Sequence, residues 1–173
     1  MLSRQTGFAR DYGRNPYEGY DEPDEQPFLL AREADRRLPP KGHVLSLIRA
    51  HGAVVVPFSS LERRPIAQLD VGREQVVVLF KRGVRSSLDA GVIADSRDVG
   101  TATAFDRRLD GRTLSFVPDR SGRFRDRETA STWDITGTAR AGPLAGRRLR
   151  PVRHDVQFWF AVAAFLPDAK IVR

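Results

Sequence analysis

The sequence contains no cysteine, and this absence removes several kinds of chemistry at once. Without a thiol the chain cannot form a disulfide, bind a metal through thiolate ligands or use a cysteine nucleophile. The sequence also lacks a run of about eighteen apolar residues, the length that a membrane-spanning helix needs. Residues 1–7 have no apolar core like that of a signal peptide. These absences predict a soluble, cytoplasmic protein with no membrane span.

Motifs of common enzymes and metal sites are also missing. The three histidines are His43, His51 and His154, and no two of them have the spacing of a helical metal pair. The sequence has no HExxH motif, no GxSxG motif, no phosphate-binding loop and no glycine-rich dinucleotide fingerprint. We therefore expect structural histidines, no metal site and no cofactor.

Lysine is scarce, so the net charge of +7 comes mostly from arginine. The charge is uneven, because residues 1–40 carry six Arg against eight acids, whereas residues 41–173 carry twenty-three Lys or Arg against fourteen acids. A basic body raises the hypothesis of nucleic-acid binding. The arginines alternate with acids, however, and no aromatic-basic motif is present. Nucleic acid is therefore a minor alternative.

The change in composition near residue 40 divides the chain. Residues 1–40 mix aromatic residues with Gly, Pro and acids and show neither helical nor strand periodicity, which is typical of an extended arm. Residues 41–173 have the apolar content of a single domain. We expect the arm either to be pinned across the body or to line a site. The residues expected to pin it are Tyr12, Tyr17, Tyr20 and Phe28.

The body has a strand-like pattern. Short β-branched runs predict strands at residues 43–49, 53–57 and 75–81, with a hairpin turn at His51-Gly52. Residues 58–64 are compatible with a short helix that has a Ser cap. Near the end, Asp155 to Leu166 carries apolar residues at helical spacing, which predicts one helix capped by Asp155. The fold class is therefore mainly β (α+β): antiparallel sheets or an open barrel, a C-terminal helix at 155–166 and an N-terminal arm.

Two further patterns lie between these segments. Residues 105–116 contain an Asp-Gly pair that predicts a tight hairpin. Residues 132–136 alternate between polar and apolar types, which predicts a strand with Trp133 and Ile135 on its buried face. A large aromatic residue in such a strand is typical of a core anchor, and the alternative for Trp133 is a ring on which a ligand stacks. The hairpin should pack near Trp133.

Six segments together suggest a family. They are RDYGRNPYEGYD (10–21), VVVPFSSL (54–61), RSSLD (85–89), FDRRLDGRTLSF (105–116), DRETASTWD (126–134) and GPLAGRRL (142–149). In this order they resemble the bacterial and archaeal family called domain of unknown function 3179, and the resemblance covers nearly the whole chain.

The resemblance implies little about function, since the family has none assigned. Longer members look like two related halves, the first with a pair of cysteines, and this chain resembles the second half. Where a comparable strand would carry cysteines, this chain has residues 78–83, VLFKRG, so thiol or metal chemistry is not carried over. The resemblance also implies that Met1 is an internal start and that longer relatives are exported or membrane-anchored.

Polar residues gather in two segments that could form a ligand site. An arginine with serine hydroxyls can hold an anion or a carboxylate, although such residues more often form turns and ion pairs. The candidate residues are Arg85, Ser86, Ser87 and Asp89 in one loop and Asp126, Arg127, Trp133 and Asp134 around the Trp133 strand.

These patterns leave three functional hypotheses. The leading one is a non-catalytic binding or structural module whose partner is an unknown small ligand or a companion half-domain. The alternative is a hydrolase with its site between the 85–89 loop and Trp133. Nucleic-acid binding through the basic body is the third. An enzyme should bring a nucleophile and a base within about 3 Å of each other in a cleft, whereas a module need not.

Overall fold

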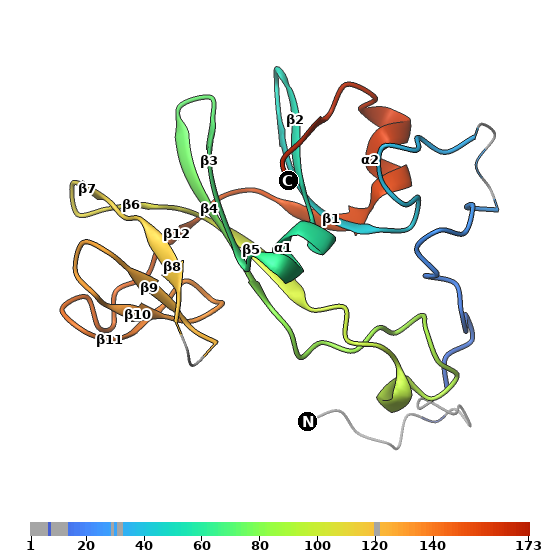
Figure 1. The fold of residues 1–173 in the computed structure, drawn as a ribbon, viewed down its shortest axis with the longest axis horizontal. Coiled ribbons are helices and arrows are strands. Elements are labelled where there is room, and N and C mark those ends of the chain that lie inside the picture. The colour runs from blue at the N-terminus through green and yellow to red at the C-terminus, as the bar shows by residue number, and fades with distance from the viewer. Residues whose placement is uncertain (1–6, 8–13, 29, 31–32, 120–121) are drawn as a thin grey trace.

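The structure is a computed structural model that describes residues 7, 14–28, 30, 33–119 and 122–173 (Figure 1). Its described residues form three four-stranded sheets and one two-stranded hairpin, and no sheet closes into a barrel. The strands pair antiparallel except where β14 runs parallel to β2. The predicted mainly β fold class is confirmed.

The first sheet has the order β13-β1-β2-β14. Its central hairpin, predicted from the sequence, pairs β1 with β2 in a register that joins Arg49 to Gly52. Two strands from the end of the chain cover its edges, so the C-terminus returns beside β2 (Figure 1). The bounds are β1 His43–Arg49, β2 Gly52–Pro57, β13 Asp155–Phe158 and β14 Lys170–Ile171.

The second sheet has the order β12-β5-β4-β3 and lies at the centre of the molecule. Its strand β4 is buried on both faces, which explains the continuous apolar run Val76 to Phe80. Val76, Val78 and Phe80 pack toward the first sheet, while Val77 and Leu79 pack toward Trp133. The bounds are β3 Ile66–Val71, β4 Glu74–Lys81, β5 Thr101–Asp106 and β12 Arg150–Pro151.

Residues 107–149 form a separate layer that we call the Trp133 lobe (Figure 1). It contains the predicted Asp-Gly hairpin, in which Asp110 and Gly111 both have positive φ, and a sheet of order β11-β10-β9-β8. Leu114 and Phe116 share the core of Trp133, as expected. The bounds are β6 Arg108–Leu109, β7 Arg112–Thr113, β8 Phe116–Pro118, β9 Phe124–Asp126, β10 Thr132–Trp133 and β11 Ala139–Ala141.

The predicted helix at 155–166 is partly wrong. Asp155–Phe158 form β13, because the free edge of β1 offers them a backbone partner, and α2 spans only Trp159–Phe165. Asp155 is therefore not a cap, and the N-cap Phe158 forms no side-chain capping bond. The helix does cover the first sheet through Trp159 and Val162.

The other helical segments are short. Helix α1 spans Phe58–Arg63 and begins after Pro57 without a side-chain cap, so the expected serine cap is wrong. A 3-10 turn, η1, spans Ile93–Asp95. No helix in the described part of the chain is long and apolar enough to cross a membrane.

The strand predicted at 132–136 is also shorter than expected. Strand β10 ends at Trp133, because the Asp134 carboxylate accepts hydrogen bonds from the backbone N–H groups of Thr136 and Thr138 and turns the chain. Ile135 still packs against the core of Trp133, although it lies outside the strand.

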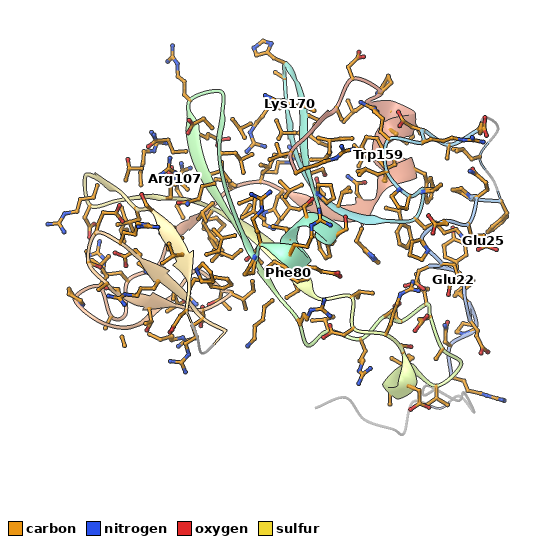
Figure 2. The ribbon with its side chains drawn as sticks, in the orientation of Figure 1. Glu22, Glu25, Phe80, Arg107, Trp159 and Lys170 are labelled. Carbon is orange, nitrogen blue, oxygen red and sulfur yellow. The ribbon has the colours of Figure 1, made fainter. Side chains whose placement is uncertain are left out.

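The arm passes along one side of the body (Figure 1). Tyr20 is one of its contacts with the body, with its ring 6.4 Å from that of Phe158 and 4.5 Å from the Lys41 ammonium. Phe28 touches Tyr20 but is 74% exposed, and Tyr12 lies outside the described residues. Farther along, Trp159 donates a hydrogen bond to the Asp35 carbonyl, which joins α2 to the arm (Figure 2).

Candidate functional site

The two groups of candidate residues lie in different parts of the molecule. The loop with Arg85, Ser86, Ser87 and Asp89 lies on the side of the arm, whereas Trp133 and its neighbours lie in the lobe at the opposite end (Figure 1). The structure therefore brings each group together within itself but does not join the two groups. A single site shared by both has no support in this arrangement.

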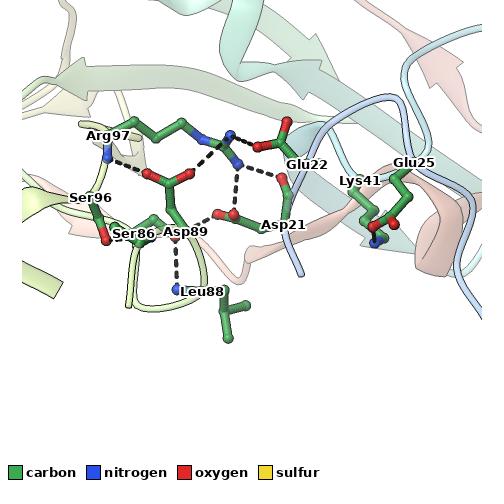
Figure 3. A network of polar contacts seen from close by, with 10 residues as sticks. Asp21, Glu22, Glu25, Lys41, Ser86, Leu88, Asp89, Ser96 and Arg97 are labelled. Carbon is green, nitrogen blue, oxygen red and sulfur yellow. Dashed lines mark hydrogen bonds and ion pairs between the residues drawn. The ribbon is translucent and has the colours of Figure 1, made fainter. Parts of the chain in front are cut away.

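The first group holds the arm to the body through Arg97 (Figure 3). The Arg97 guanidinium lies 2.7 Å from the Asp21 carboxylate and 3.4 Å from that of Asp89. Ser86 donates its hydroxyl hydrogen to Asp21, which is 1% exposed. Because Asp21 belongs to the arm, these bonds connect segments that are far apart in the sequence.

Asp89 and Arg85 of the same loop form hydrogen bonds with the neighbouring segment at Ser96 and Arg97. Asp89 accepts a hydrogen bond from the Arg97 backbone N–H at 2.6 Å, and Arg85 donates to the Ser96 carbonyl at 2.5 Å. Ser87 is exposed and forms no hydrogen bond with a described residue. Ser86, Asp89 and Arg85 are thus occupied by the protein itself, and only Ser87 presents a free hydroxyl to solvent.

Two members of the second group, Asp126 and Trp133, lie in the interior of the Trp133 lobe. Trp133 is fully buried, and its indole Nε1–H donates to the Asp126 carboxylate at 2.8 Å. Asp126 also accepts hydrogen bonds from the backbone and hydroxyl of Thr129, and that hydroxyl contacts Ser131 at 2.7 Å. Trp133 is a core anchor, as expected, and its burial leaves no ring face for a ligand.

Asp134 and Arg127 lie at the surface of this lobe. The Asp134 carboxylate is held by its own turn and by the Arg140 Nε–H at 2.5 Å. Burial raises the pKa of Asp134, but hydrogen bonds from Thr136 and Arg140 outweigh it and hold that pKa below its usual value. Arg127 is exposed and uses its backbone N–H to bond Ser115.

A pocket of about 260 Å³ lies where the arm meets the body, and no motif in the sequence indicates it. The volume is close to the lower end of the usual range for ligand pockets, roughly 300–1,000 Å³. The arm contributes Pro23, Leu38 and Pro39 to its wall. The apolar residues from the body are Val44, Pro57, Phe58 and Val99, and the polar ones are Lys41, His43, Ser59, Glu62, Arg97 and Asp98. We call it the His43 pocket.

His43 is a polar, partly buried residue of this pocket whose ring has no hydrogen-bond partner among the described residues. Its ring stacks on Phe58 at 5.7 Å and lies 4.9 Å from the Phe158 ring, yet no described residue forms a hydrogen bond with it. Burial lowers the pKa of His43, against a smaller opposing effect of the Asp21 charge. The ring is therefore neutral near pH 7, with one nitrogen that can donate and one that can accept.

The cations in the pocket wall are already compensated. The Lys41 side chain is 2% exposed and lies 2.5 Å from the Glu25 carboxylate. Arg97 is surrounded by the carboxylates of Asp21, Glu22 and Asp89, and we call Arg97, these three acids and Ser86 the arm clamp. The Asp98 carboxylate is held by the backbone N–H groups of Gly83, Gly100 and Val84, which lower its pKa. The wall thus offers fixed dipoles and apolar surface rather than a free charge.

Sequence reasoning missed this pocket because its parts are distant in the chain. His43 opens a strand and was expected to be structural, and Lys41 and Arg97 belong to no recognisable motif. The feature of the sequence that could have indicated the pocket is the arm, for which lining a site was one of two alternatives. Among the described residues, no cluster of three His, Asp or Glu could hold a metal ion, and no serine hydroxyl forms a hydrogen bond with a histidine ring.

The fold and site define a layered, mainly β protein with an arm that closes a small pocket. The chain belongs to the family described as "Protein of unknown function (DUF3179)", whose family model matches residues 1–169. No curated protein and no solved structure gave a match. Membership therefore confirms the resemblance found in the sequence and assigns no activity, so function must be argued from the geometry.

Proposed function

We propose that the chain is a non-catalytic binding module and that it holds a small, largely apolar molecule with one hydrogen-bonding group in the His43 pocket. The observation that carries this proposal is the neutral, partly buried His43 ring, which faces a preformed pocket and lacks a hydrogen-bond partner among the described residues. The ring nitrogens of His43 are not among the fully buried atoms that lack a partner, so water can reach them and the hydrogen-bonding group of a ligand could replace that water.

The chemistry of the wall supports this class of ligand. Proline, leucine, valine and phenylalanine side chains make up much of the wall, and each charged side chain has its own counterion or backbone partner. A charged ligand would find no unpaired opposite charge, whereas an aromatic amide or alcohol could bury its ring against Phe58 and bond to His43. Sites of this kind usually combine an apolar wall with few polar contacts.

The loop with Arg85, Ser86, Ser87 and Asp89 has an indirect role in this proposal. Ser86 and Asp89 hold Asp21 and Arg97, and these residues keep the arm over the pocket. The other partner that the sequence suggests is a companion half-domain, which could bind the same side of the body only by displacing the arm. A small molecule that binds while the arm stays in place therefore favours the ligand over the half-domain.

The proposal is tested by protein-detected NMR with benzamide as the probe. Benzamide should shift the His43 ring signals and bind with millimolar or tighter affinity, as expected for about ten heavy atoms. The variant Ser59→Phe places a ring in the pocket wall and should weaken binding at least ~10-fold, because it fills the space that the probe needs.

The matched control is Ser87→Phe, which makes the same change on an exposed loop outside the pocket. It should bind benzamide like the parent protein. If Ser87→Phe weakens binding and Ser59→Phe does not, the ligand lies at the 85–89 loop and the pocket assignment is wrong. The absence of any shift at His43 with benzamide or related aromatic alcohols would refute the proposal.

A further inference from the structure

A second hollow, far from the His43 pocket, gathers positive charge. It lies where the end of β4 meets the Trp133 lobe and has a volume of about 370 Å³. Lys81, Arg123 and Arg140 line it together with Asp134, Gly122 and Ile135. The three cations come from three separate segments, which the fold brings to one place.

Only part of this positive charge is neutralised by its surroundings, through the ion pair between Arg140 and Asp134 at 2.5 Å. Lys81 and Arg123 form no ion pair with any residue that the structure describes, and both are exposed. Asp134 is the acid in the hollow, and it already accepts hydrogen bonds from Thr136, Thr138 and the Nε–H of Arg140. The terminal nitrogens of Arg140 therefore remain available, so three donors face the hollow with one carboxylate that is already satisfied.

An apolar slot continues this hollow. The slot has a volume of about 340 Å³ and shares Lys81, Gly122 and Arg123 with the charged hollow. Pro65 and Pro118 form most of its accessible apolar surface, because Phe80 and Phe124, which also border it, are only 4% and 2% exposed. Arg82, Glu62 and Asp119 line the slot as well, and Arg82 pairs with Glu62 at 3.6 Å. Together the two hollows form one groove, the Lys81–Arg123 groove, with a cationic end and an apolar end.

We propose that the Lys81–Arg123 groove binds a small phosphomonoester, with its phosphoryl group among Lys81, Arg123 and Arg140 and its apolar body along Pro65 and Pro118. A phosphomonoester carries close to two negative charges and three terminal oxygens, which suits three converging cationic donors better than a carboxylate does. The Trp133 lobe adds a favourable field, since residues 107–149 carry ten arginines against five acids.

The groove is independent of the His43 pocket, because the two have different walls apart from the exposed side chain of Glu62. Binding in one can fail without affecting the other. The charge of the lobe raises one competing explanation, a nonspecific attraction of any polyanion to its many arginines. The apolar slot distinguishes the two, because a polyanion gains nothing from Pro65 and Pro118.

Isothermal titration calorimetry with phenyl phosphate and inorganic phosphate tests the proposal on the full chain. Phenyl phosphate should bind at least ~5-fold more tightly than inorganic phosphate, because its ring can enter the apolar slot. The variant Arg123→Gln should weaken phenyl phosphate at least ~10-fold, since it removes a charged donor. Arg112→Gln, which makes the same change in the exposed β6–β7 hairpin, should leave the affinity within ~2-fold.

Other outcomes overturn the proposal. Equal loss in Arg123→Gln and Arg112→Gln would mean that only the overall charge matters. Equal affinity for the two phosphates would remove the role of the slot. A single-stranded oligonucleotide that displaces phenyl phosphate with a steep salt dependence would point to nucleic-acid binding instead. If Arg123→Gln does not fold, Lys81→Gln replaces it, with Lys170→Gln as the control for an exposed lysine.

Discussion

The Trp133 lobe and the arm clamp each contain a buried carboxylate, but the partners of the two carboxylates lie at very different distances in the sequence. In the lobe, the buried Asp126 carboxylate binds Trp133, only seven positions away in the sequence. In the clamp, the buried Asp21 accepts a hydrogen bond from Ser86, sixty-five positions away, and pairs with Arg97. Both carboxylates are almost fully buried and both have partners, but only the first finds them within its own turn.

This difference predicts different stability. The hydrogen bonds of Asp126 lie within one short segment, so we expect them to break only when the lobe unfolds. Removing them should therefore lower the stability of the whole core. The clamp joins a segment without regular structure to the body, and such segments can open locally at less cost than global unfolding. The lobe should therefore behave as part of the core and the arm as a separately opening unit.

The largest expected effect tests the lobe side of this distinction. Trp133→Ala should lower the free energy of unfolding by about 3–5 kcal/mol, because it leaves a large cavity and removes the hydrogen bond to Asp126. Chemical denaturation followed by circular dichroism measures the change. Phe165→Ala, which truncates a ring that is 85% exposed, is the control and should change stability by less than ~0.5 kcal/mol. A loss below about 1 kcal/mol for Trp133→Ala would mean that the lobe is not part of the core.

A smaller effect is expected on the arm side. Arg97→Gln leaves the buried Asp21 without its ion pair, and release of the arm is the least costly way to rehydrate that carboxylate. Global stability should fall by about 1–2 kcal/mol, while cleavage of residues 14–40 by a protease should accelerate about 10-fold. Limited proteolysis followed by mass spectrometry measures the rate.

The control for the arm is Arg36→Gln, which removes an exposed pair with Glu33 within the arm and should change neither quantity appreciably. The distinction between the two regions fails if Arg97→Gln destabilises the protein as much as Trp133→Ala and cleavage is not concentrated in the arm. In that case the arm and the body unfold as one unit.

The same contrast explains what the sequence could predict. The hairpins at 43–57 and 105–116, the strand β4 and the burial of Trp133 follow from short-range periodicity and turn residues, and the structure confirms them. The errors occurred where a distant partner decides the structure. Residues 155–158 carry a helical pattern but pair with β1, more than a hundred positions away. The His43 pocket was missed for the same reason.

Candidate site residues were subject to the same limit. Asp126, Asp134, Ser86 and Asp89 were chosen because polar groups gather around turns and strands, and that observation was sound. The sequence could not show that each of them already has an internal partner, because Ser86 and Asp89 meet the arm and Arg97 only in the folded chain. Polar residues in a sequence therefore indicate a network more reliably than a binding site.

Asp106 combines a partner that is near in the sequence with a distant one on a single carboxylate. It accepts hydrogen bonds from Arg108, two positions away, and lies 2.7 Å from the Arg150 guanidinium, forty-four positions away. The Arg108 hydrogen bond is the main cause that holds the pKa of Asp106 well below its usual value, although burial opposes it.

Because the native Asp106 carboxylate resists protonation, its contribution of about 1–2 kcal/mol to the free energy of unfolding is present above the unfolded pKa of about 4 and is lost as the pH falls below it. Asp106→Asn should therefore lose stability at pH 7 and show a shallower decline between about pH 4 and pH 2 than the parent. Denaturant melts across this range, repeated with Arg108→Gln and Arg150→Gln, measure the contribution of each partner, and a larger loss for Arg150→Gln would show that the distant partner dominates.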